Sequence, residues 1–513
     1  MLPSLWARCS ALRPQKQLFL RSVHKPSVQA RPLLQSQRLS AFAAGKFARN
    51  GQSSILSTIR SQCRSLSGAV TSTRLSFDPR FFSSNASGVL SAETLAANEA
   101  SDSANADALP KLTPPSVAIW LLASSALVFA VIVVGGVTRL TESGLSITEW
   151  RPIAGILPPL TQSHWEEEFE KYKATPEFKM INHSISLSEF KSIFYMEWGH
   201  RVLGRLIGLG FVVPLVYFAS RRMLPRSLAR NLSLYALLIG FQGALGWYMV
   251  KSGLEDSLLE TPGAVPRVSQ YRLAAHLGTA FVLYAGMFST GISILTDWRW
   301  AKKGVWSGLK DTGSGAVWKS VLENPAVRRF ARYSKVLTGL VFLTALSGAF
   351  VAGLDAGLLY NEFPLMGGRL APPSDELFSP LYAKKPDGSD IWWRNIFENP
   401  TTVQFDHRCL AITTYFSTAA LYAATLRPTL RAALPPLARR MALSAFAMAN
   451  LQVLLGISTL IYLVPISLAA MHQAGSVMLL TTMMHLLVSL RRPGAAAKIW
   501  RQTQMNARKA RSS

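Results

Sequence analysis

The chain has 513 residues, of which 49% are hydrophobic and only 16% are charged, and its formal net charge is +26. This composition excludes an ordinary soluble protein of the same length and is typical of a membrane protein with several spans. The positive charge is concentrated in the first 77 residues, which contain no Asp or Glu, and in short loops between apolar runs. That distribution indicates targeting and membrane topology, so we expect no nucleic-acid partner.

The acid-free beginning is rich in Arg and Ser, which is typical of a mitochondrial transit peptide. A disordered basic tail is the alternative. Because Arg80-Phe81-Phe82-Ser83 resembles a matrix-protease cleavage site, we expect a transit peptide over 1–82 and a polar linker over 83–115. Cys9 and Cys63 fall in the transit peptide, so Cys409 alone remains and the mature chain can form no internal disulfide.

Eight apolar runs follow, each near the length of about 20 residues that crosses a bilayer as a helix. Helix is required because lipid offers no partner for free backbone groups, and the strand alternation of a barrel is missing. The predicted spans are Ser116–Leu140, Glu197–Ala219, Leu232–Val250, Tyr271–Leu295, Val336–Leu358, Phe405–Leu426, Met441–Val464 and Leu468–Leu490.

Lys and Arg predict the orientation of these spans. The loops after the second, fourth and sixth spans and the tail after the eighth are basic, whereas the long loop 141–196 is rich in Glu. The positive-inside rule therefore places both termini in the matrix and the long loops toward the intermembrane space.

The chain also repeats itself, at four places in the same order. Gly135 and Gly144-Leu145 correspond to Gly348 and Gly357-Leu358, His200-Arg201 to His407-Arg408, Gln242 and Gly246 to Gln452 and Gly456, and His276 to His472. The prediction is an all-α polytopic membrane protein with two tandem, pseudo-symmetric four-helix bundles. The first spans 116–295 and the second 336–490, with a matrix loop over 296–335 and a basic matrix tail over 491–513.

The repeat makes four histidines candidate ligands. Ionisable residues inside membrane spans are costly and commonly functional, although a single buried histidine can equally be structural. His200 pairs with His276 and His407 with His472, each pair near one end of its bundle. Two facing imidazoles can supply both axial ligands of a haem iron. Zinc fits less well, because it usually has at least a third protein ligand and none repeats beside the pairs.

Charged neighbours accompany the pairs. Arg139, Arg201, Arg205 and Arg408 are candidate partners for haem propionates, with interfacial snorkelling as the alternative. Glu197 lies one helical turn before His200, whereas Gln404 occupies the corresponding place before His407. One half could therefore perform acid–base chemistry beside a haem while the other holds a haem or passes electrons. Glu197 could instead be an interfacial residue that faces water.

These motifs are similar to those of the mitochondrial haem A synthase family, over roughly residues 115–490. The resemblance is carried by the block 135–146, Trp150-Arg151-Pro152, the block from Glu189-Phe190 to Arg205, Asn361–Met366, Phe405-Asp406-His407-Arg408 and the segments around His276 and His472. Bacterial members often carry a cysteine pair in the first outer loop, and the loop 141–196 has none.

The resemblance implies oxidation of the C8 methyl group of haem O to a formyl group, which makes haem A for cytochrome c oxidase. It implies Glu197 as the catalytic carboxylate. His200 and His276, with Arg139, Arg201 and Arg205, would bind the substrate haem O, and His407, His472 and Arg408 would bind a haem b cofactor. A multi-pass protein of the mitochondrial inner membrane is expected.

The resemblance also implies partners: a ferredoxin-type electron-transfer system, the haem O synthase and cytochrome c oxidase assembly factors. The sequence leaves the oligomeric state open, with a homo-oligomer among the options. Two other functions remain as alternatives, a non-catalytic bis-histidine b-type cytochrome and a haem carrier. The Glu197/Gln404 difference argues against two equivalent halves.

Overall fold

The computed structural model describes residues 109–151, 154–260, 264–311 and 316–512. The predicted transit peptide, its cleavage site, most of the linker and Pro152 lie outside these residues. Eight long helices dominate the described part: α5 Pro115–Leu140, α8 Leu187–Ser220, α9 Arg226–Lys251, α11 Gln270–Lys303, α13 Pro325–Gly353, α16 Pro400–Leu426, α18 Pro436–Ile461 and α19 Ile466–Ser489.

Shorter elements occupy the connections. They are η1 Ala154–Ile156, α6 Gln162–Lys173, α7 Pro176–Met180, α10 Ser257–Glu260, β1 Val305–Trp306, β2 Leu309–Lys310, α12 Val317–Glu323, η2 Ala356–Leu358, α14 Ser374–Leu377, η3 Pro380–Tyr382, α15 Ile391–Glu398, α17 Pro428–Ala433 and α20 Ala495–Ser512. β1 and β2 form a two-stranded antiparallel hairpin.

The polytopic all-α prediction is confirmed. Within the described ranges, seven helices are long and apolar enough to cross a membrane. The helix α19 is the predicted eighth span and is not among the seven. It carries His472, Gln473 and His485, which lower its hydropathy, and it packs against α5, α11, α13 and α18. A helix surrounded by other helices needs less apolar surface toward lipid, so α19 can span a membrane despite its lower hydropathy. That α19 is an eighth span remains a prediction.

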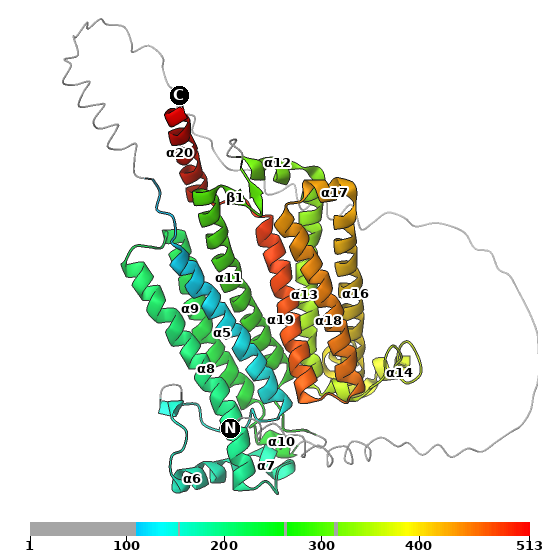
Figure 1. Ribbon diagram of the computed structural model, residues 1–513. Coiled ribbons are helices and arrows are strands. Elements are labelled where there is room, and N and C mark those ends of the chain that lie inside the picture. Colours follow the sequence, from blue (N-terminus) through cyan, green and yellow to red (C-terminus); the bar gives the residue numbers. More distant parts are fainter. Residues whose placement is uncertain (1–108, 152–153, 261–263, 312–315, 513) are drawn as a thin grey trace, which may run out of the picture. The chain divides into compact units, whose positions relative to one another are not determined.

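The long helices form two groups (Figure 1). One apolar core joins α5, α8, α9 and α11, and a second joins α13, α16, α18 and α19. Between the groups the contacts are reciprocal, because α5 packs against α19 and α13 packs against α11. The first helix of each group thus meets the fourth helix of the other. At this boundary the hydroxyl groups of Tyr284 and Thr481 lie 2.6 Å apart.

Several predicted boundaries were wrong. α8 begins at Leu187 rather than Glu197, because Ser186 and Glu189 form a capping box there. α13 begins at Pro325 and ends at Gly353, well before Leu358, because Asp355 adopts a left-handed conformation with φ 52°. α11 continues to Lys303, so the predicted matrix loop contains helix ends, the hairpin and α12. The predicted tail forms α20 over most of its length.

The basic connections and the long outer loops lie at opposite ends of the helices. Figure 1 shows α6, α7, α10 and α14 at one end and β1, α12, α17 and α20 at the other. The basic loops and the tail therefore share one end, and the long outer loops share the other. This arrangement agrees with the charge pattern from which the topology was predicted.

Candidate functional site

Each of the four candidate histidines packs against a glycine of a neighbouring helix. A Cβ atom added to the glycine would lie close to Cε1 of the imidazole. The distances are 2.8 Å for Gly135 and His200, 3.3 Å for Gly246 and His276, 3.5 Å for Gly348 and His407, and 2.9 Å for Gly456 and His472. All four glycines belong to the internal repeat, so the two halves share this packing.

The close approach explains the residue type. At Gly135 and Gly456 an added Cβ would lie less than 3.0 Å from the imidazole, so only glycine leaves room there, whereas at Gly348 the Cβ would make an ordinary contact. His200 and His276 lie within electrostatic range of each other, and so do His407 and His472. The structure therefore brings together the two pairs that the sequence predicts.

Polar contacts also hold the helices that carry the histidines. Gln242 Nε2 donates to the carbonyl of His276 at 3.2 Å, and Gln452 Nε2 donates to the carbonyl of His472 at 2.7 Å. The weak repeat of these glutamines thus has a structural reason, since each joins the third helix of its half to the fourth.

The histidine side chains retain unused bonding capacity. Nδ1 of His200, His276 and His472 is buried and has no hydrogen-bond partner among the described residues, while Nδ1 of His407 lies 2.7 Å from Ser347 Oγ. Each ring is nevertheless only partly buried as a whole. Buried polar atoms normally have a hydrogen-bond partner, so imidazoles that lack one and occur in matched pairs are suited to binding a ligand. Paired imidazoles on facing helices suit a haem iron.

Glu197 lies at the centre of a hydrogen-bond network and is 3% exposed. Its Oε2 accepts from Ser146 Oγ at 2.7 Å and from the Ile147 amide at 2.9 Å. Its Oε1 accepts from Arg201 Nη2 at 2.6 Å and Nε at 3.1 Å. Every one of these partners donates, so both oxygens of the carboxylate act as acceptors. The network ties the loop after α5 to the histidine-bearing helix α8.

Arg201 and Arg408 perform the same task in the two halves. Arg201 donates to the carbonyls of Ile147 and Glu149, at 3.0 and 3.2 Å. Arg408 donates to those of Tyr360 and Leu365, at 2.8 and 3.0 Å. Each arginine thus fastens the loop that follows the first helix of its half.

Gln404 occupies the counterpart position of Glu197. Its Nε2 donates to the Tyr360 carbonyl at 3.1 Å, while its Oε1 is buried without a partner in the described structure. The two halves therefore share a framework of loop anchors but differ in charge at this one position.

The remaining predicted arginines lie at the edge of the first half. Arg205 donates to the Arg151 carbonyl at 2.9 Å. Arg139 pairs with Asp355 of the second half at 2.9 Å, and Arg267 approaches the same carboxylate at 3.5 Å. Burial lowers the pKa of Arg267, although Asp355 opposes that shift. Arg139 thus connects the halves, which sequence reasoning missed together with Asp355 and Arg267.

The other histidines lie apart from the pairs. His485 stacks edge-on against Phe288, with ring centroids 6.2 Å apart. His164 is exposed in the outer loop. Among the described residues no group of three or more His, Cys, Asp and Glu side chains could hold a metal ion.

Comparison with known proteins identifies the family. Residues 118–484 match the family of cytochrome oxidase assembly proteins. Heme A synthase COX15 of Saccharomyces cerevisiae is 47% identical over 383 residues, which cover 75% of this chain and 77% of the relative. Heme A synthase of Nitrosospira multiformis is 45% identical, with 73% and 94% covered.

A third relative is a Heme A synthase-mitochondrial ferredoxin fusion protein of Schizosaccharomyces pombe. It is 46% identical over 377 residues, which cover 73% of this chain and 60% of the fusion. Both histidine pairs fall within the matched span, and the chain belongs to the cytochrome oxidase assembly protein family.

Proposed function

We propose that this protein is a haem A synthase of the mitochondrial inner membrane, which oxidises the C8 methyl group of haem O to a formyl group. The observation that carries the proposal is the identity of 45–47% to proteins named heme A synthase across most of the chain. The matched histidine pairs support it independently, since each pair is suited to one haem.

His200 and His276 are proposed to hold the substrate haem O, and His407 and His472 a haem b cofactor. Bound haem iron would supply the redox chemistry. The chain supplies the axial imidazoles, the glycine surfaces against which they are held, and the arginine-anchored loops beside them. We infer that Arg139, Arg201, Arg205 and Arg408 act chiefly through these loops and through the contact between the halves.

An asymmetry in packing supports the assignment of the substrate to the first half, which follows from the family resemblance and from the difference between Glu197 and Gln404. Aligning Gln242 with Gln452 pairs four core positions of α9 with four of α18. In α18 they are Ala438, Ala442, Ala445 and Ala449, which are all buried, and in α9 they are Leu228, Leu232, Tyr235 and Ile239. Alanines allow close helix approach in membranes, and α18 packs more closely on α19 than α9 does on α11. The first half is therefore better suited to a haem with a long isoprenoid tail.

Glu197 is proposed as the catalytic carboxylate because it adds a buried negative charge beside the first pair, where the second pair has the neutral Gln404. Its ion pair with Arg201, at 2.6 Å, places this charge one helical turn from His200. Glu197 also has a second role, since it accepts hydrogen bonds from Ser146 Oγ and the Ile147 amide in the loop after α5. A useful test must separate these two roles.

The first experiment is extraction and mass analysis of the haems bound to the purified full-length protein. The proposal expects haem O, haem A or a hydroxylated intermediate together with haem b. Haem b alone in both sites would mean a non-catalytic cytochrome, and unmodified haem that exchanges freely would mean a carrier.

The second experiment compares two variants. Glu197→Gln should abolish haem A formation while haem remains bound. Ser146→Ala removes one hydrogen bond to the carboxylate and leaves the charge, so it should retain most of the activity. Normal haem A formation by Glu197→Gln would rule out the catalytic role. Equal loss of activity and of haem in both variants would assign Glu197 to loop anchoring alone.

The electron-transfer partner is proposed to be a ferredoxin-type protein, because one relative is a natural fusion with mitochondrial ferredoxin. The charge pattern supports matrix termini and histidine pairs toward the intermembrane space. The haem O synthase and oxidase assembly factors remain expected partners by family, and a homo-oligomer remains an option.

A further inference from the structure

The helix α15 has its polarity reversed relative to a helix that faces water. Its charged and amide side chains point inward: Asp390, which precedes it, is 2% exposed and Asn395 is 0% exposed. Its apolar side chains point outward, and Trp392 is 65% exposed. The neighbouring Leu381 is 93% exposed, and Phe378 packs against Trp392 with ring centroids 4.7 Å apart.

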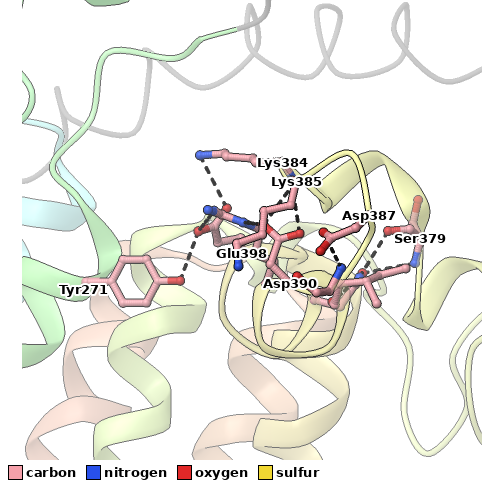
Figure 2. Close-up of polar contacts among 11 residues, drawn as sticks. Tyr271, Ser379, Lys384, Lys385, Asp387, Asp390 and Glu398 are labelled. Carbon is pink, nitrogen blue, oxygen red and sulfur yellow. Dashed lines mark hydrogen bonds and ion pairs between the residues drawn. The ribbon is translucent and has the colours of Figure 1, made fainter.

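A dense polar network holds this orientation (Figure 2). Arg394 donates to Asp390 at 2.5 Å and to Glu398 at 2.7 Å. Tyr271 of α11 donates to Glu398 at 3.1 Å. The amides of Lys384 and Lys385 donate to Asp390. Because the inward charges are paired with one another, α15 cannot roll over to expose them without breaking these bonds.

The corresponding loop of the first half provides an internal comparison. There α6 buries Trp165, Phe169 and Tyr172 and exposes glutamates, among them Glu166 and Glu170. This is the ordinary pattern of a helix that faces water. The helices α6 and α15, at the same end of the protein, therefore present opposite surfaces, so the exposed aromatics of α15 are not shared by every helix at that end.

The surroundings of α15 indicate what covers its outer face. Only Asn399 separates α15 from α16, which is long and apolar enough to span a membrane. α15 therefore lies where a span leaves the bilayer, at the depth where Trp and other aromatic residues gather. Part of its aromatic row is already used, because Trp393 and Phe397 pack near Tyr271 and Phe350. Trp392, Ile396, Phe378 and Leu381 remain outward.

We propose that α15 and the adjoining segment 378–381 form a lipid-seated ledge, with Trp392, Ile396, Phe378 and Leu381 inserted into the membrane interface. The occupant of this surface is the bilayer itself. The ledge is joined to Tyr271 at the beginning of α11 and to Phe350 of α13, so it sets the depth of the helices that carry His276 and Gly348. This inference does not depend on the proposed catalytic activity.

The test measures collision rates of nitroxide labels with oxygen, which concentrates in lipid, and with a nickel chelate, which stays in water. Labels are placed at Trp392→Cys and separately at Leu381→Cys, in the full-length protein with Cys9, Cys63 and Cys409 replaced by Ala. The protein is reconstituted in phosphatidylcholine–cardiolipin vesicles with the chelate on both sides. Leu237→Cys on the outward face of α9 is the lipid control, and Glu166→Cys on α6 is the water control.

The proposal expects both labels to resemble Leu237→Cys, with high oxygen and low nickel collision rates. Nickel collision rates as high as those of Glu166→Cys would overturn it and would make the patch a water-facing docking surface. Low rates for both reagents would also overturn it, because a second copy or another protein would then cover the face. The Leu381 label keeps the test valid if Trp392→Cys disturbs the fold, since Leu381 is almost fully exposed.

Discussion

The glycines behind the histidines allow a matched test of the two haem sites. A Cβ at Gly135 would lie 2.8 Å from His200 Cε1, whereas a Cβ at Gly348 would lie 3.5 Å from His407 Cε1. Carbon atoms pack best at about 3.5–4.0 Å, so Gly348→Ala fits and Gly135→Ala forces the imidazole or the helix to move. Overpacking of this kind costs about 1–3 kcal/mol. If that cost falls on the ligand geometry, haem affinity at the first site drops roughly 5- to 140-fold.

The assay is titration of the haem-depleted protein with haem, followed by absorbance of the bis-histidine species and by redox titration. Gly135→Ala should lose affinity or shift the potential at one site only, and Gly348→Ala should titrate like the unmodified protein. The third helices offer the reverse contrast, because Gly456 of the second half is the tight position, at 2.9 Å, and Gly246 of the first half is the looser one, at 3.3 Å. If Gly135→Ala and Gly348→Ala bind both haems with unchanged affinity and potential, the histidine–glycine contacts do not belong to ligand sites.

Three further predictions concern stability. Arg501→Gln removes the ion pair between Arg501 and Asp311, whose side chain is 0% exposed. It should weaken the docking of α20, seen as faster proteolysis of 495–512; unchanged proteolysis would mean that other contacts hold α20. Burial would raise the pKa of Asp390, but hydrogen bonds from Arg394 and two backbone amides outweigh it and lower the pKa to about 2. The stabilising effect of ionised Asp390 is therefore complete above pH about 4 and is lost as the pH falls toward 2. Pepsin should cut the α15 loop increasingly over that range. In Asp390→Asn, pepsin should cut the loop throughout the range. A double-mutant cycle of Tyr284→Phe and Thr481→Val should give a coupling of about 0.6 kcal/mol between the halves, and additive effects on thermal stability would refute that bond.

Local sequence patterns were sufficient to predict the long apolar helices. Hydrophobicity over a span and positive charge in the loops are properties of short segments, so they can be evaluated without knowing which helices pack together. The internal repeat then paired His200 with His276 and His407 with His472, because equal order along two halves implies equal placement. Helix ends were less predictable, since Ser186 extends α8 outward through a capping box and Asp355 turns the chain before Leu358.

The tertiary structure decided what each side chain contacts. Gly135 and Gly348 appeared in the sequence only as repeated letters, and the fold made them the surfaces behind two imidazoles. The sequence distinguishes Glu197 by its place before His200 and its contrast with Gln404, but only the fold brought Ser146 and Ile147 to its carboxylate. Arg139 is expected beside the substrate haem from the sequence, and the fold also pairs it with Asp355 across the boundary. Hydropathy and repeats report which residues leave water, whereas hydrogen bonds depend on segments that are far apart along the chain and meet only when the helices pack.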